Sequence, residues 1–151
     1  MKEIVLFVLI STFCACVINF ADLEGDCFLQ SEEAVQSAIY GHIDAKGLKS
    51  IIDSKISFTL LDARGNKWKD GNIIPGAKMA SHEFEKEELE NMISDKDSLV
   101  VVYCYSFSCP LSKQLALKLI ETGYTNIIIY PAGLTEWRES ASYPVSEIIR
   151  L

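Results

Sequence analysis

The side chains best suited to nucleophilic chemistry are two cysteines in the segment CYSFSC, namely Cys104 and Cys109. Cys104 directly follows residues 99–103, an apolar and β-branched run typical of a strand buried on both faces of a parallel sheet. After the second cysteine, Pro110 is suited to the first turn of a helix, and apolar residues recur at helical spacing as far as Gly123, a typical C-terminal stop. We therefore predict a buried strand, a short loop and a helix, with Cys104 at the carboxyl end of the strand.

The loop after Cys104 has the features of an anion site. Where a strand passes through a tight loop into a helix, free N–H groups and the positive end of the helix dipole meet. A thiolate there is stabilised, so its pKa falls below that of a free cysteine. The alternative is a buried, unreactive thiol at a strand end, since cysteine is among the most buried residue types. In the reactive alternative the donors are the backbone amides of the loop and two serine hydroxyls, from Tyr105, Ser106, Phe107, Ser108 and Cys109.

Two sequence motifs resemble those of a known family. The first surrounds Cys104: YC precedes a short loop, a helix ending in TGY, a strand and then PAGLTEW. The second, LLDARGNKWKDGNIIPGA at residues 60–77, has a strand ending in Asp-x-Arg and a Gly-x-Ile-Pro-Gly-Ala turn. Together they are similar to the two halves of the rhodanese-like (sulfurtransferase) domain signature, and the resemblance covers residues 43–145. It implies an α/β fold, a parallel, doubly wound sheet of about five strands with helices on both faces.

The resemblance also implies an activity. Rhodanese-like sulfurtransferases carry sulfane sulfur as a persulfide on the loop cysteine, here Cys104, and pass it to a thiol or cyanide acceptor. The expected partners are therefore a small-molecule or protein-bound sulfur donor and a thiol acceptor, and no cofactor is expected. Members that use thiosulfate usually have an arginine or lysine in the loop, whereas CYSFSC has neither and Lys113 is the nearest cation in the sequence. A neutral or protein-bound persulfide donor is therefore favoured over thiosulfate.

Asp62 and Arg64 belong to the second motif. They follow a strand predicted over residues 57–61, at the edge of the sheet where α/β proteins place their ligand crevice. We expect them to support the site by fixing the loop through hydrogen bonds and an ion pair, rather than to take part in catalysis.

Cys109 offers the loop a second chemistry. It lies at the start of the predicted helix, where the dipole would activate its thiol, and the C-x4-C spacing resembles that of a subset of rhodanese-like proteins. It could act as a resolving thiol that converts a persulfide or sulfenic acid on Cys104 into a disulfide. Such a bond needs Cα atoms within about 7 Å, and the spacing leaves that open. Two alternatives to sulfur transfer therefore remain: a thiol–disulfide redox protein that uses Cys104 and Cys109, and a catalytically silent rhodanese-like binding module.

Length and composition argue against several other classes. A chain of 151 residues, 49% of them hydrophobic, can form one ordinary core, so we expect a single folded domain. The formal net charge of −7 argues against nucleic-acid binding, which needs a basic surface. The two histidines, His42 and His82, lie in different segments and no regular Cys–His spacing is present, so no metal site is predicted.

The N-terminus has the pattern of an export signal. Residues 4–18 form an apolar run that is short for a membrane-spanning helix and has no polar face. We expect residues 1–21 to be a signal peptide, cleaved after Ala21, or after Ala15 to leave Cys16 for lipid attachment; an uncleaved membrane anchor, which would tether the protein, is the third alternative. The protein is then expected to be periplasmic or otherwise extracytoplasmic, with an N-terminal extension at residues 22–42 and the rhodanese-like domain at residues 43–151.

Apolar spacing predicts three further helices. The first lies within residues 28–40 and is capped by Ser31, and the second is capped by Asp44. The third covers residues 81–93 and has a single apolar face, as expected for a helix on the surface of the domain.

Overall fold

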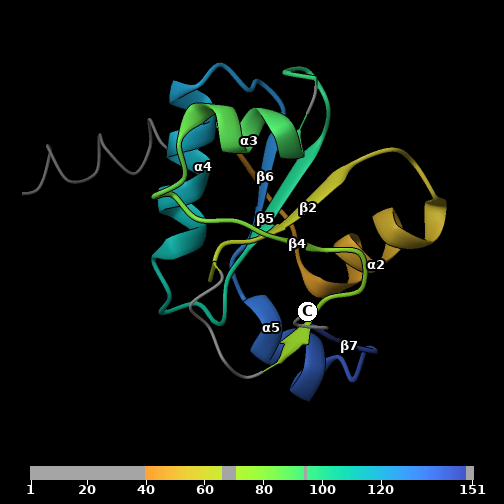
Figure 1. The fold of residues 1–151 in the computed structure, drawn as a ribbon. Coiled ribbons are helices and arrows are strands. Elements are labelled where there is room, and N and C mark those ends of the chain that lie inside the picture. The colour runs from red at the N-terminus through yellow and green to blue at the C-terminus, as the bar shows by residue number, and fades with distance from the viewer. Residues whose placement is uncertain (1–39, 66–70, 94, 149–151) are drawn as a thin grey trace, which may run out of the picture.

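The computed structural model describes residues 40–65, 71–93 and 95–148. A five-stranded sheet in the order β1-β6-β5-β2-β4 forms its centre (Figure 1). Every neighbouring pair in this sheet runs parallel. The strands are β1 (Gly41–His42), β2 (Thr59–Asp62), β4 (Lys78–Met79), β5 (Val100–Tyr103) and β6 (Ile127–Tyr130).

β5 is the central strand of the sheet. All of its residues are buried, and it pairs with β2 on one side and β6 on the other, so that Val102 stands between Leu61 and Ile129. Branched aliphatic side chains suit such a strand because both of its faces pack against other elements. The apolar run at residues 99–103 is therefore a strand from Val100 to Tyr103, as predicted.

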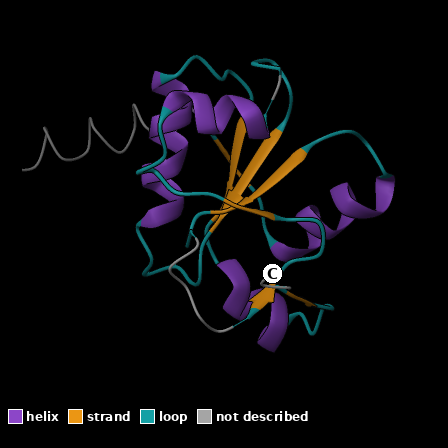
Figure 2. Cartoon of the chain, in the orientation of Figure 1, coloured by secondary structure: helices purple, strands orange, loops and turns teal. Residues whose placement is uncertain are grey.

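Helices cover both faces of the sheet (Figure 2). On one face, Leu89 and Leu115 join Val102 in one buried core. On the other face, Leu48 and Trp137 join Val101 in a second core. The first face carries α3 (Lys86–Met92) and α4 (Leu111–Glu121), and the second carries α2 (Ala45–Ser54), α5 (Gly133–Thr135) and the short π-helix η1 (Glu136–Ser140). The predicted parallel, doubly wound α/β fold is confirmed.

The ends of α2 and α4 follow from their sequences. Asp44 caps α2, because its Oδ1 accepts a hydrogen bond from Gly47 N at 2.7 Å. Pro110 occupies the N-cap of α4, one position before the helical turn in which we expected it. After α4 the chain turns at Gly123, whose φ of +96° suits glycine and few other residues.

The helix α3 is shorter than the sequence predicts. We expected a helix over residues 81–93, but α3 begins at Lys86. A capping box fixes this start: the Glu85 side chain accepts from the backbone of the first turn, and Glu88 Oε2 accepts from Glu85 N at 2.8 Å. Ahead of it the chain forms a turn, in which Phe84 N donates to Ser81 O at 3.1 Å.

The sheet begins earlier than the domain boundary that we placed at residue 43. β1 pairs with β6, with Gly41 opposite Ile128 and His42 opposite Ile129. The end of the predicted N-terminal extension therefore belongs to the folded domain. The predicted signal peptide, and the predicted helix up to residue 39, lie outside the described residues. Among the helices that the structure describes, none is both long and apolar enough to cross a membrane.

A small second sheet joins the end of the domain to the second motif. β3 (Asn72–Ile73) pairs antiparallel with β7 (Ser146–Glu147). Ile148 N donates to Gly71 O at 2.7 Å and extends this pairing. The described part of the second motif that begins at Gly71 is therefore paired with the end of the domain.

Candidate functional site

The two cysteines of the loop are joined to each other. Cys104 directly follows β5 and is 1% exposed, whereas Cys109 directly precedes Pro110 and is partly exposed. A disulfide bond links them, and their Cα atoms are 6.2 Å apart, within the range that such bonds allow. The spacing C-x4-C left this pairing open, and the structure has the bond.

Hydrogen bonds within the loop fold it back on itself. Cys109 N donates to Ser106 O at 3.0 Å, and the hydroxyl oxygens of Ser106 and Ser108 lie 3.0 Å apart in a hydrogen bond of their own. The serine hydroxyls, predicted as further donors to an anion, thus contact each other. By contrast, the N–H groups of Ser106, Phe107 and Ser108 donate to no atom of the described residues, which leaves them available to an anion at the loop.

A turn after β6 holds the start of the loop. Leu134 N donates to Cys104 O at 3.0 Å, and Thr135 donates to Tyr105 O from both its N and its Oγ1, each at 2.9 Å. Gly133 has φ +66° and lies so close to the backbone of Cys104 and Tyr105 that a side chain there would collide with it. The PAGLT part of the first motif therefore positions the cysteine loop, through backbone contacts and the Thr135 hydroxyl.

Asp62 and Arg64 form a buried ion pair at the end of the neighbouring strand. Arg64 Nη2 lies 2.7 Å from Asp62 Oδ2, and both side chains are fully buried. Arg64 Nη2 also donates to Asn72 O at 2.6 Å, which fastens the turn of the second motif. In the sheet register Asp62 lies opposite Tyr103, the residue before Cys104. The pair is thus buried beside the end of the strand that precedes Cys104; its predicted role in supporting the site stays a prediction.

Tyr103 connects this ion pair to the strand that carries Cys104. Its hydroxyl accepts a hydrogen bond from Ile74 N at 3.0 Å, and the side chain interacts electrostatically with Asp62. Burial raises the pKa of Tyr103 well above its usual value, and the negative charge of Asp62 raises it further. The phenol therefore stays protonated, and its hydrogen bond with Ile74 N joins the second motif to the strand that precedes Cys104.

A cation from a distant part of the sequence borders the loop. Hydrogen bonding to Glu139 is the largest cause of a raised pKa at Arg138, and a hydrogen bond and charge interaction with Tyr105 add to it. Arg138 lies in η1, and Lys113 is nearer to the loop in the sequence, so spacing along the chain gave no signal for this contact. The loop itself has no cation, but the fold places one against its first residue after Cys104.

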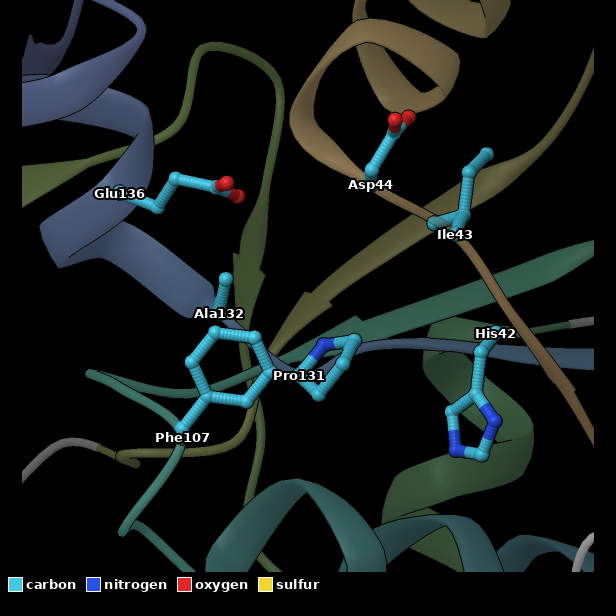
Figure 3. A pocket seen from close by; sticks show the side chains of 7 residues that line it. All are labelled: His42, Ile43, Asp44, Phe107, Pro131, Ala132 and Glu136. Atoms are coloured by element: carbon cyan, nitrogen blue, oxygen red, sulfur yellow. The ribbon is translucent and has the colours of Figure 1, made fainter.

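A cavity of about 260 Å³ adjoins the loop at Phe107 (Figure 3). Phe107, which is 77% exposed, lines it together with two carboxylates, Asp44 and Glu136. Tyr130 donates from its hydroxyl to Glu136 Oε2 at 2.7 Å, and burial followed by this hydrogen bond raises the pKa of Tyr130. The remaining lining residues are His42, Ile43, Pro131 and Ala132. The cavity thus combines apolar walls with negative charge.

The described site offers cysteine sulfur, backbone amides and carboxylates. Among residues 40–65, 71–93 and 95–148, no group of three or more His, Cys, Asp or Glu side chains could hold a metal ion.

A parallel α/β sheet with a cysteine loop at the carboxyl end of its central strand defines a class of protein. The model of the rhodanese-like domain family matches residues 44–140, and the chain belongs to this family. No curated protein sequence matches the chain.

Solved structures share the fold at low sequence identity. A protein from Bacillus halodurans is 17% identical with a TM-score of 0.63, over 80% of this chain and 85% of that one. A rhodanese-like domain from Anabaena sp. is 24% identical with a TM-score of 0.59, over 72% of this chain and 80% of that one. A thiosulfate sulfurtransferase from Pseudomonas aeruginosa is 16% identical with a TM-score of 0.61, over 80% of this chain but only 22% of that one. At these identities the likeness concerns the fold alone.

Proposed function

We propose that this chain is a sulfurtransferase that carries sulfane sulfur as a persulfide on Cys104 when the loop is reduced. The observation that carries the proposal is the position of Cys104. It directly follows the central strand of a rhodanese-like domain and begins a loop in which the N–H groups of Ser106, Phe107 and Ser108 donate to none of the described residues. Backbone amides in such a loop stabilise an anionic sulfur.

The transfer consists of two substitutions at sulfur. The Cys104 thiolate attacks the outer sulfur of a persulfide donor, the S–S bond of the donor breaks, and the donor leaves as a thiolate. Cys104 then carries an added sulfur. An acceptor thiolate or cyanide attacks that outer sulfur, and the electron pair of the S–S bond returns to Cys104. The loop amides stabilise the negative charge on the Cys104 thiolate before it attacks the donor and again after the acceptor has taken the outer sulfur.

The disulfide favours a second candidate function, thiol–disulfide exchange. In this alternative Cys109 is the partner thiol of Cys104, and the pair alternates between the dithiol and the bonded form. Export, which the N-terminal sequence predicts, would place the pair in a compartment where disulfides persist. The third alternative, a silent binding module, would leave both cysteines without turnover.

The intact mass of the reduced protein distinguishes these functions. Reduced full-length protein is freed of reductant, exposed to a small persulfide donor and weighed again. We expect a gain of one sulfur, removed on addition of cyanide with release of thiocyanate. A loss of two hydrogens without added sulfur would instead support the redox protein, and an unchanged mass would support the silent module.

A charge in the loop is expected to widen the range of donors. Ser108 is exposed, so Ser108→Arg brings a guanidinium to the loop without filling the core. We expect turnover with the dianion thiosulfate to rise about fivefold, the factor that corresponds to about 1 kcal/mol of charge attraction at a surface.

Ser108→Gln is the matched control, because it lengthens the side chain and adds no charge. Its thiosulfate turnover should stay at the level of the unmodified protein. If the arginine and glutamine variants behave alike while Cys104 remains reactive, charge does not limit the use of thiosulfate.

A further inference from the structure

The two ends of the Cys104–Cys109 disulfide differ in exposure. Cys104 is 1% exposed at the end of a buried strand, whereas Cys109 is partly exposed and is flanked by the exposed residues Ser108 and Pro110. A nucleophile that cleaves a disulfide attacks one sulfur and expels the other, and access decides which sulfur is attacked. Attack is therefore directed to Sγ of Cys109, with Cys104 as the leaving group.

We propose that the oxidised loop takes up inorganic sulfide. Hydrosulfide, HS⁻, attacks Sγ of Cys109 and forms a new S–S bond, while the Cys104–Cys109 bond breaks and its electron pair leaves with Cys104 as a thiolate. The product is a persulfide on Cys109, which keeps the proton of the hydrosulfide. The sulfide sulfur is oxidised to sulfane sulfur and the disulfide is the oxidant, so no other reagent enters. This reaction belongs to the oxidised loop and is separate from the loading of reduced Cys104.

The surroundings of the disulfide favour a small anion as the nucleophile. The N–H groups of Ser106, Phe107 and Ser108 make no hydrogen bond to the described residues, and the N-terminus of α4 follows Cys109 directly. Both present the positive ends of dipoles to the loop. Hydrosulfide carries its charge on a single heavy atom and therefore needs little room beside the disulfide.

The cavity beside the loop disfavours larger acidic thiols. Asp44 and Glu136 line it together with Phe107, and neither carboxylate has an ion-pair partner among the residues that the structure describes (Figure 3). A thiol such as glutathione, which bears carboxylates of its own, would meet like charges on this side. Hydrosulfide has no group that reaches the cavity.

Cys104 is also a favourable leaving group. Its charge develops at the base of the loop, where the unused amides can stabilise a thiolate. A leaving thiol of lowered pKa departs faster in thiol–disulfide exchange. The oxidised loop should thus react with sulfide faster than an unstructured disulfide does.

Oxidised full-length protein, incubated with sodium sulfide without oxygen and quenched at short times with iodoacetamide, tests the proposal. We expect a gain of one H₂S at the loop. Chymotrypsin cleaves after Phe107 and separates the two cysteines, so the alkylated persulfide should be found on Cys109 and the alkylated thiol on Cys104. The rate constant should exceed that of glutathione disulfide with sulfide by about tenfold.

Three controls remove the oxidant and should show no uptake: reduced protein, Cys104→Ser and Cys109→Ser. Absence of uptake by the oxidised protein, a rate no higher than that of glutathione disulfide, or a persulfide found on Cys104 at the earliest quench would overturn the proposal. None of these results depends on whether reduced Cys104 accepts sulfur from a persulfide donor, so the two proposals fail separately.

Discussion

Cys104→Ser is expected to abolish persulfide formation in the reduced protein, because serine has no thiolate to attack a sulfur donor. The same change removes the disulfide, since Cys109 loses its partner. In the reduced unmodified protein, the Cys104 thiol should titrate below the roughly 8.5 of a free cysteine because the loop amides stabilise its thiolate. The measurements are the intact mass after a persulfide donor and the pH dependence of alkylation at Cys104.

Cys109→Ser is the matched control at the other end of the same loop. In a sulfurtransferase this variant keeps persulfide formation on Cys104, because Cys109 takes no part in the attack on the donor. In a redox protein it leaves Cys104 trapped as a mixed disulfide or an overoxidised acid, because the resolving thiol is missing. Persulfide formation lost in Cys109→Ser but retained in Cys104→Ser would reverse the assignment of the nucleophile.

Local patterns in the sequence were sufficient to predict the elements that carry the site. The run at residues 99–103 is apolar throughout, and a strand buried on both faces is the structure that such a run favours. Asp44 and Gly123 likewise mark helix ends through chemistry that acts within one turn. The two motifs also predicted contacts between distant segments, because their likeness to a known family implied that the strands of both motifs lie together in one sheet. β2 does pair with β5.

Features that depend on tertiary structure had weaker signals or none. β1 spans only Gly41–His42, which is too short to show the alternating pattern of a strand. It is a strand because it pairs with β6. The Arg138 contact with Tyr105 joins segments far apart in the chain. The disulfide depends on a loop that folds back from Ser106 to Cys109, and two cysteines at this spacing could equally be held apart. In each case the deciding contact depends on the tertiary structure, which residue types and their spacing do not specify.

Among positions outside the cysteine loop, we expect Gly133 to be the one whose replacement disturbs the loop most. A Cβ at this position would lie 2.8 Å from Tyr105 C and 2.9 Å from Tyr105 O, and closer still to Cys104 O. These atoms are backbone and cannot rotate away, and the φ of +66° adds strain for any residue with a side chain. Gly133→Ala should therefore lower the free energy of unfolding by about 3 kcal/mol, from overpacking together with backbone strain.

We expect Gly133→Ala to disturb the cysteine loop itself, in addition to lowering the stability of the domain. To admit the methyl group, the backbone of Cys104 and Tyr105 must move away from the turn, which breaks the hydrogen bonds from Leu134 and Thr135 to their carbonyls. Folded Gly133→Ala should consequently load sulfur on reduced Cys104 more slowly than the unmodified protein. Urea denaturation and the rate of persulfide formation measure the two effects.

Gly76→Ala separates backbone strain from collision. Gly76 also has a positive φ, +83°, but no atom of the described residues lies within 4 Å of the position of its Cβ, apart from those of Gly76 and its two chain neighbours. Its replacement should cost only the strain, about 1 kcal/mol, and leave sulfur loading unchanged. Equal losses of stability at the two glycines would mean that the turn at Gly133 yields to a side chain, and that the close approach to Cys104 is not what fixes the loop.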